Sequence, residues 1–178
     1  MIKKKNIRAL SQEELVEQML AWGEKPFRAK QVHEWLWKKG KGVALFSEMK
    51  NVPKLLQEKL EQQYDIYKLL VEDEQKSNDG TVKSAFKLHD GNVVEGVLIP
   101  SAKRTTACIS SQVGCSLSCA FCATGKMGRI RNLSADEIYD QVVAVAEQSL
   151  RTQNRPLSNI VYMGQGEPLH NFDAEQLQ

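Results

Sequence analysis

Hydrophobic residues recur at helical spacing through the first third of the chain. Ser11 and Glu14 have the spacing of a capping box, and Leu15 and Met19 follow at i, i+4, which predicts a helix that begins after Ser11. Two more helices are predicted to begin at prolines: one at Pro26, with Val32, Trp35 and Leu36 on one face and Gly40 near its end, and one at Pro53, with Leu56 and Leu60 on its inner side. Residues 1–63 are therefore expected to form a small helical bundle.

After Tyr64 the chain changes to short runs rich in Val, Ile, Leu and Phe. These runs occupy residues 66–71, 81–88 and 92–99, with turn-forming sequences at 78–80 and 90–91 between them. Runs of this length separated by Asn-Asp-Gly and Asp-Gly are typical of antiparallel strands joined by tight turns. We expect a small antiparallel meander over residues 64–100 that links the bundle to the remainder.

From about Arg104 the pattern predicts strand, loop, helix and strand in turn. The expected strands are residues 105–110 and 158–163. Between them, Ser134 and Glu137 form a second capping box, followed by a helical stripe of apolar residues that ends near Leu150: Ile138, Val142 and Val145. Two strands that bracket a helix predict the opening βαβ unit of a parallel α/β sheet or barrel over residues 101–178. The predicted fold class is α/β.

Composition and charge add little to this organisation. The chain has 42% hydrophobic and 26% charged residues, and no apolar run approaches the roughly 18 residues that span a bilayer. The basic start lacks the apolar stretch of a secretory signal, so a cytoplasmic location is expected. The net charge is +2, but residues 1–63 carry 13 Lys+Arg against 8 Asp+Glu. A basic segment is compatible with a phosphate-bearing partner, and a solvated helical surface is the alternative.

The strongest chemical signal is a cluster of three cysteines. Cys115, Cys119 and Cys122 have the spacing C-x3-C-x2-C, and thiolates at such spacing are typical ligands of an iron–sulfur cluster. A 4Fe–4S cluster held by three cysteines keeps one iron without a protein ligand. S-adenosylmethionine (SAM) can chelate that iron, and an electron from the cluster then cleaves SAM to a 5′-deoxyadenosyl radical.

Zinc is the alternative metal for these cysteines. Structural zinc takes four closed ligands, and the only further cysteine is Cys108, while His89 and His170 are isolated. A zinc-stabilised RNA-binding module and an iron–sulfur redox sensor therefore stay open beside the enzyme. Phe121, an aromatic residue directly before the last cysteine, fits the radical SAM form and is a candidate cover for the adenine of SAM.

A glycine-rich turn follows the second predicted strand. In parallel α/β folds, ligands gather beyond the carboxyl ends of the strands, where glycines let the backbone approach them. Gly166 is a candidate of this kind, and the carboxylate of Glu167 is a candidate acceptor for the ammonium group of SAM.

Together these segments resemble the RlmN-type dual-specificity 23S rRNA and tRNA adenine methyltransferases of the radical SAM superfamily. The resemblance lies in residues 104–115, 119–128, 131–134 and 163–171, and in 26–30 and 49–53, which are similar to the helical accessory domain of the family. It implies a partial (β/α) barrel, a 4Fe–4S cluster and SAM as cofactors, 23S rRNA and tRNA as substrates, and an electron donor such as flavodoxin. Pro168-Leu169 is more similar to the enzymes that methylate carbon 2 of adenosine than to those that methylate carbon 8.

The resemblance also implies roles for two further residues. The family methylates one of its own cysteines, transfers the carbon to RNA as a radical, and releases the product when a second cysteine captures the first as a disulfide. Cys108 matches this resolving cysteine, although a free strand cysteine is more often a buried core residue. Glu95 matches the proposed proton acceptor. Its apolar neighbours would raise its pKa, whereas a solvent-facing carboxylate paired with Lys83 or Lys87 is the alternative.

The four cysteines leave none to carry the methyl group. Three match cluster ligands and Cys108 matches the resolving residue, while the family's barrel needs further strands after Gln178. From the sequence we therefore expect an incomplete fragment that does not turn over by itself.

Overall fold

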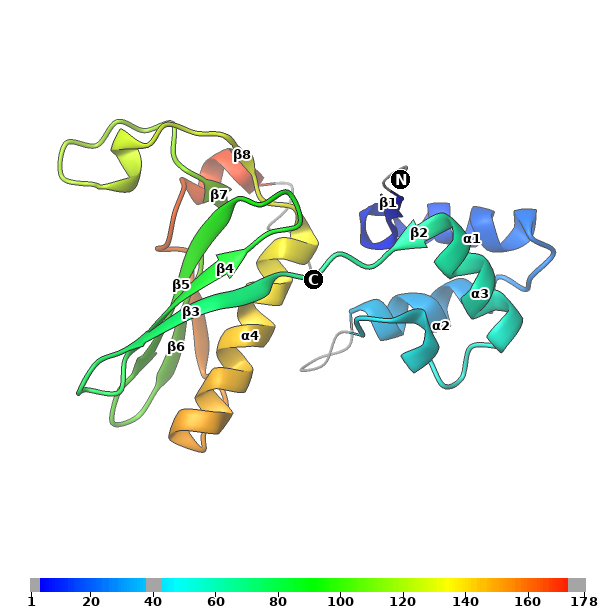
Figure 1. The fold of residues 1–178 in the computed structure, drawn as a ribbon, viewed down its shortest axis with the longest axis horizontal. Helices are drawn as coiled ribbons and strands as arrows, with labels where there is room; N and C mark the ends of the chain where they lie inside the picture. The colour runs from blue at the N-terminus through cyan, green and yellow to red at the C-terminus, as the bar shows by residue number, and fades with distance from the viewer. Residues whose placement is uncertain (1–3, 38–42, 173–178) are drawn as a thin grey trace. The chain divides into compact units, whose positions relative to one another are not determined.

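A computed structural model describes residues 4–37 and 43–172 and divides the chain into two compact units, Met1–Tyr67 and Lys68–Gln178 (Figure 1). The predicted helix end at Gly40, the basic residues Lys38 and Lys39, and Gln178 lie outside the described residues. Each unit has its own buried hydrophobic core.

The first unit is the helical bundle that the sequence predicts. Its helices are α1 (Gln12–Ala21), α2 (Phe27–Leu36) and α3 (Lys54–Gln63), with short 3-10 turns η1 (Ile7–Ala9) and η2 (Phe46–Glu48). The predicted inward positions are buried in one cluster, which includes Leu15, Met19, Val32, Leu36, Leu56 and Leu60. The capping box at α1 is confirmed: Glu14 N donates to Ser11 Oγ at 3.1 Å, and Ser11 N donates to Glu14 Oε2 at 2.7 Å.

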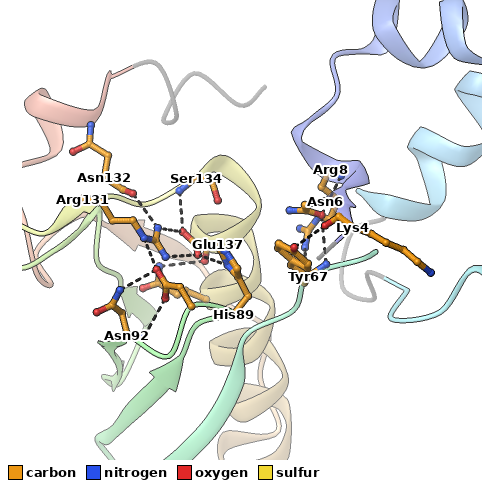
Figure 2. Close-up of polar contacts among 12 residues, drawn as sticks. Lys4, Asn6, Arg8, Tyr67, His89, Asn92, Arg131, Asn132, Ser134 and Glu137 are labelled. Atoms are coloured by element: carbon orange, nitrogen blue, oxygen red, sulfur yellow. Dashed lines mark hydrogen bonds and ion pairs between the residues drawn. The ribbon is translucent and has the colours of Figure 1, made fainter. Parts of the chain in front are cut away.

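A short strand pair closes this unit. β1 (Lys5–Asn6) pairs in parallel with β2 (Tyr64–Asp65), which the sequence analysis did not predict. Polar contacts around Tyr67 extend the closure: the phenol donates to Lys4 O at 2.8 Å, and Tyr67 N donates to Asn6 Oδ1 at 3.4 Å (Figure 2). The guanidinium of the buried Arg8 lies 4.7 Å from the ring centroid of Trp37.

The second unit is built on a five-stranded sheet. Its strands are β3 (Leu70–Lys76), β4 (Val82–Lys87), β5 (Val93–Pro100), β6 (Thr105–Cys108) and β9 (Asn159–Val161), in the spatial order β3-β4-β5-β6-β9. β3 to β6 are antiparallel neighbours, whereas β6 and β9 are parallel and are connected through α4 (Ala135–Gln153). The predicted βαβ unit is therefore present. β7 (Gln112–Val113) and β8 (Arg131–Asn132) form a separate antiparallel pair.

One face of the sheet packs on α4 (Figure 1). Along β5, Val94 and Leu98 are buried in the core cluster, which also contains Ile138 and Val145 of α4. Glu95 and Val97 alternate with these buried positions and project from the opposite face. Because Val97 is paired with Cys108 on β6, Cys108 shares that opposite face.

The first strand of the meander lies later in the chain than predicted. It runs over Leu70–Lys76 rather than 66–71, and most of its residues are exposed. β3 is an edge strand, so its polar sequence suits its position, while the apolar residues before it serve another purpose: Ile66 packs against the core of the first unit and Leu69 against that of the second.

The predicted three-part division also differs from the two observed units. The break lies between Tyr67 and Lys68, so residues 64–67 belong to the first unit. The strands of the meander, β3 to β5, belong to the same unit as the βαβ segment, because β5 pairs directly with β6. Within the described residues, no helix combines the length and the apolar character that crossing a membrane requires.

Candidate cluster and cofactor site

The three clustered cysteines lie on a loop whose two ends touch. β7 leads into the loop and β8 leads out of it, and the two strands pair with Gln112 opposite Asn132. At the neck, Gly114 has φ +74° and a Cβ there would lie 1.8 Å from the carbonyl oxygen of Gly128. Only glycine permits this approach and this backbone conformation together. We call residues 114–128 the cysteine loop.

Inside the cysteine loop the backbone turns tightly around the cysteines. Cys119 N donates to Leu117 O at 2.9 Å and Cys122 N donates to Cys119 O at 3.1 Å, and the 3-10 turn η3 (Thr124–Lys126) follows. Gly125 packs against this backbone, because a Cβ there would lie 2.7 Å from Leu117 O. Hydrogen bonds from the backbone of Gly125 and Thr124 lower the pKa of the Cys122 thiol, which favours the thiolate that binds metal.

The three cysteines are close in sequence, but their side chains do not converge on a common metal position in the described structure. Cys115 is buried, and Cys119 and Cys122 are partly exposed. Among residues 4–37 and 43–172, no three His, Cys, Asp or Glu side chains are arranged to hold a metal ion. The donor set nevertheless suits an iron–sulfur cluster, since it consists of three thiols on one tight loop, one of them with a lowered pKa.

The glycine-rich turn after β9 lies against the start of the cysteine loop. The backbone N–H groups of Ser111 and Gln112 donate to Gln165 O at 2.9 and 3.2 Å. Gly166 has φ +101°, and a Cβ there would lie 2.6 Å from Cβ of Gln112. The glycine thus makes room for Gln112 in this structure, and its predicted approach to a ligand stays a prediction.

Glu167 stands at the end of this turn. Its backbone N–H donates to Gln112 Oε1 at 2.9 Å, and its carboxylate accepts from Leu169 N at 3.1 Å at the start of the 3-10 turn η4 (Pro168–Asn171). The side chain is partly exposed and therefore accessible to a ligand. Nearby, Ser111 Oγ and Gln165 Oε1 are buried without a hydrogen-bond partner among the described residues, so polar atoms are available for a bound molecule such as SAM.

Buried amides join these segments, and the sequence analysis did not identify them. Asn171 Nδ2 donates to Ser111 O and to Leu133 O, both at 2.8 Å. It thereby connects the segment that enters the cysteine loop (residues 111–113) with the segment that leaves it (residues 129–133), which we call the two legs of the loop. On α4, Gln141 Oε1 accepts a hydrogen bond from Ser110 N at 2.9 Å, and Gln141 Nε2 donates to Ser110 O at 3.1 Å. The only sequence signal for them is polar residues within otherwise buried segments, which does not reveal their partners.

The cysteine loop also contacts η4 directly. Ser116 Oγ lies 3.1 Å from His170 Nδ1, and Asn132 Nδ2 donates to His170 O at 2.9 Å. Several apolar side chains in and beside the cysteine loop and the glycine-rich turn are strongly exposed: Phe121 (93%), Met127, Ile130, Met163 and Leu169. The predicted role of Phe121 toward adenine is untested by these contacts.

An ionic cluster fixes the return leg of the loop to the rest of the unit. Arg131 meets the Glu137 carboxylate with two hydrogen bonds of 2.7 and 2.8 Å, and its Nε donates to Asp90 Oδ2 at 2.7 Å (Figure 2). His89 Nδ1 lies 3.3 Å from Glu137 Oε1. The hydrogen bonds that Arg131 donates to Glu137, and then the one to Asp90, raise the pKa of Arg131 despite its partial burial. Glu137 also accepts from Ser134 N at 3.0 Å, at the start of α4.

Glu95 lies on β5 in an ion pair. Lys83 Nζ is 2.6 Å from Glu95 Oε1, and the two side chains are 47% and 45% exposed, respectively. The structure thus places Glu95 in the solvent-facing pair that the sequence left open, not among apolar side chains. Its backbone is nevertheless near the site, because Ser110 Oγ donates to Glu95 O at 2.7 Å.

Cys108 ends β6 between β5 and β9, paired with Val97 and Val161. It is 8% exposed. Burial raises the pKa of its thiol, and a hydrogen bond with the backbone of Met163 partly offsets this. Burial thus favours the protonated thiol of Cys108 over its thiolate.

Comparison with known proteins finds similar sequences among RNA methyltransferases. Residues 5–66 match the family described as the ribosomal RNA large subunit methyltransferase N-terminal domain. A probable dual-specificity RNA methyltransferase RlmN of Flavobacterium johnsoniae is 54% identical over 172 residues, which are 97% of this chain and 49% of that protein. Its counterpart of the same name in Cytophaga hutchinsonii is 55% identical over 171 residues, 96% of this chain and 46% of that protein.

Among solved structures, a radical SAM methyltransferase from Sphaerobacter thermophilus is similar with a TM-score of 0.79 and 39% identity. The match covers 96% of this chain and 50% of that one. The chain thus spans about half the length of the relatives that it matches.

Proposed function

We propose that this chain carries the cluster-binding and SAM-contacting part of an RlmN-type dual-specificity RNA methyltransferase, the enzymes to which it is similar over almost all of its length. The reaction proposed is methylation of carbon 2 of adenosine in 23S rRNA and tRNA. One observation carries the proposal: a C-x3-C-x2-C loop, closed at its glycine neck, lies against a Gly-x-Gly-Glu turn at the end of a parallel strand.

In this proposal Cys115, Cys119 and Cys122 hold a 4Fe–4S cluster within a partial barrel that begins with β6-α4-β9. The bound cluster and SAM together supply the 5′-deoxyadenosyl radical. Gly166 and Glu167 contact SAM, with the Glu167 carboxylate accepting from its ammonium group. That carboxylate is partly exposed and accepts from Leu169 N, which leaves lone pairs for a further donor.

Product release is assigned to Cys108 and Glu95. The reaction needs a further cysteine, beyond the four in this chain, to carry the methyl carbon into the covalent adduct with RNA. The sulfur of Cys108, once deprotonated, attacks the sulfur of that cysteine. A disulfide forms, the carbon–sulfur bond breaks, and its electron pair stays on carbon, which takes up a proton from water to become the methyl group. Glu95 accepts the proton that leaves adenine carbon 2. The shared sheet face of Glu95 and Cys108 supports this pairing of roles.

The substrate and the electron donor complete the proposal. The first unit would bind rRNA and tRNA through phosphates, because residues 1–63 have an excess of five basic residues (13 Lys+Arg against 8 Asp+Glu). A small redox protein such as flavodoxin would supply electrons to the cluster.

Anaerobic reconstitution tests the proposal. The chain should bind iron and sulfide and develop the broad visible absorption of a 4Fe–4S cluster, and Cys115→Ala, Cys119→Ala and Cys122→Ala should each abolish it. Cys108→Ala is the matched control and should retain the cluster. Adding SAM to the reduced cluster should yield a changed electron paramagnetic resonance signal. Stoichiometric zinc without sulfide, or normal iron content in any of the three variants, would contradict the assignment.

A further inference from the structure

Gln112 occupies the point where the cysteine loop and the glycine-rich turn meet. It begins β7, three residues before Cys115, and is fully buried. A buried primary amide is costly unless its carbonyl and its NH2 group both find partners. The partners of Gln112 therefore indicate what its burial stabilises.

The side chain of Gln112 joins three segments that are far apart in the sequence. Its Oε1 accepts from Glu167 N at 2.9 Å, and its Nε2 donates to Asn132 Oδ1 at 2.8 Å. Its own position is on the leg that enters the cysteine loop, while Asn132 is on the leg that leaves it. One amide thus connects both legs of the loop to the residue proposed to receive SAM.

The shape of the turn matches this side chain. Gly166 lacks the Cβ that would lie 2.6 Å from Cβ and 2.8 Å from the backbone nitrogen of Gln112. Gly166 also has φ +101°, which side-chain-bearing residues rarely adopt. The glycine before Glu167 therefore allows the turn to close onto Gln112, and the hydrogen bond to Glu167 N follows from that contact.

We propose that Gln112 is a positioning residue that fixes the Glu167 turn relative to the cysteine loop. This inference rests on the proposed function, since it gives Gln112 the task of holding a SAM-contacting carboxylate at a set place beside the cluster ligands. Gln112 acts through the backbone of Glu167 and does not itself touch a reacting group. Without its acceptor, Glu167 N is left unpaired and the turn loses a contact that selects one conformation.

Two substitutions separate this role from simple core packing. Gln112→Met keeps the length and the apolar stem but removes both hydrogen bonds, whereas Gln112→Glu keeps an acceptor for Glu167 N and, protonated in its buried site, a donor for Asn132. Gln148→Met is the matched control. Gln148 is also buried in this unit, and its Nε2 donates to Ser84 Oγ and Glu74 Oε1, both at 2.8 Å, away from the cysteine loop.

Amide hydrogen exchange by NMR on the chain without cofactors gives the first readout. Exchange at Glu167 should be about tenfold faster in Gln112→Met, the order expected for one lost buried hydrogen bond. It should be near the parent value in Gln112→Glu and Gln148→Met. Equal exchange at Glu167 in the parent and Gln112→Met would overturn the proposal. If Gln112→Met does not fold, Asn132→Ala removes the other partner of the amide, and unchanged exchange at Glu167 there would equally overturn it.

Affinity for SAM in the reconstituted chain gives the second readout. Gln112→Met should bind SAM about tenfold more weakly at unchanged iron and sulfide content, and Gln112→Glu should restore the affinity. Loss of iron in Gln112→Met would show a general role in the loop and would overturn positioning of the turn. If the parent itself does not bind SAM, the proposed function fails, while the exchange rates still decide whether Gln112 holds Glu167.

Discussion

A Cβ on Gly114 would lie 1.8 Å from the carbonyl oxygen of Gly128, so the backbone closes the cysteine loop at its neck. We expect Gly114→Ala to force the two legs apart and to lower the free energy of unfolding by about 2 kcal/mol or more, because a backbone clash adds to the strain of a positive φ. The measurement is urea denaturation together with thiol accessibility of Cys119 and Cys122, which should rise.

Gly91→Ala provides the control for that prediction. Gly91 has a similar φ of +87°, but no atom of the described residues lies within 4 Å of the position that a Cβ would take there. The variant should lose only about 1 kcal/mol and leave the thiols unchanged. Equal losses in the two variants would show that the close contact at the neck does not matter.

Local signals explain why much of the fold follows from the sequence. Capping boxes, prolines and apolar stripes act within a few residues, and α1, α2, α3 and α4 lie close to their predicted positions. The predicted position of β3 is wrong because an edge strand needs few apolar residues, so its sequence resembles a polar linker. Pattern alone cannot separate such a strand from a loop.

The sequence predicts candidate residues of the site, but not the contacts that position them. The spacing of the three cysteines is local, whereas the partners of Gln112 and Asn171 are 20 to 60 residues away in the sequence. Nothing along the chain identifies such pairs before the sheet is formed. Glu95 shows the same limit, since its neighbours in sequence are apolar but its partner across the hairpin is Lys83.

The ion pair of Arg131 with Glu137 should contribute more to stability than that of Arg151 with Glu74. Each pair has two hydrogen bonds. The first contains a buried carboxylate, since the Glu137 side chain is 6% exposed, whereas the second contains an exposed guanidinium, since the Arg151 side chain is 59% exposed. Arg131→Gln leaves a buried carboxylate without its main partner and should cost about 3 kcal/mol. Arg151→Gln should cost about 1 kcal/mol or less. Chemical denaturation of the two variants checks this, and similar losses would contradict it.

The contact of Arg131 with Asp90 predicts a loss of stability in acid. Burial alone would raise the pKa of Asp90, but hydrogen bonds from Arg131 and Asn92 outweigh it and hold the pKa far below its usual range. A lowered pKa in the folded state means that the stabilisation is complete above the unfolded pKa of about 4 and is lost as the pH falls below it.

Asp90→Asn tests this dependence. The free energy of unfolding should fall less steeply below about pH 4 in the variant than in the parent. In an Arg131→Gln background, the difference between Asp and Asn at position 90 should shrink, because the main charged partner is gone. A difference that persists unchanged in that background would assign the low pKa to other groups.

RNA binding by the first unit should depend on the exposed lysines that flank Arg28. Arg28 itself is engaged, since its Nη1 donates to Gln31 Oε1 at 2.7 Å and to Asn51 O at 3.3 Å. Lys25 and Lys30 are exposed, so their reversal to Glu should weaken RNA binding without unfolding the bundle. If each contacts one phosphate, the slope of log affinity against log salt should flatten by about 1.5.

The matched control reverses Lys54 and Lys59, two exposed lysines of α3 in the same unit. The two double variants change the net charge equally, so general electrostatic attraction falls by the same amount in both. Filter binding at several salt concentrations measures affinity and slope. Equal effects of the two variants would mean that Lys25 and Lys30 form no specific phosphate site.

The two extremes of cysteine environment should be distinguishable by alkylation. Hydrogen bonds from the backbone of Gly125 and Thr124 lower the pKa of Cys122, whereas burial raises that of Cys108. The thiolate is the reactive form, so in the chain without metal Cys122 should react with iodoacetamide well before Cys108 at pH 7.5. Raising the pH should speed Cys108 more than Cys122, because Cys122 reaches its full thiolate fraction at lower pH. Mass spectrometry of timed digests gives both rates, and labelling in urea should make them converge. If Cys108 reacts as fast as Cys122 in the folded chain, the sheet does not protect its thiol. That result would contradict the idea that Cys108 stays unreactive until the RNA adduct forms.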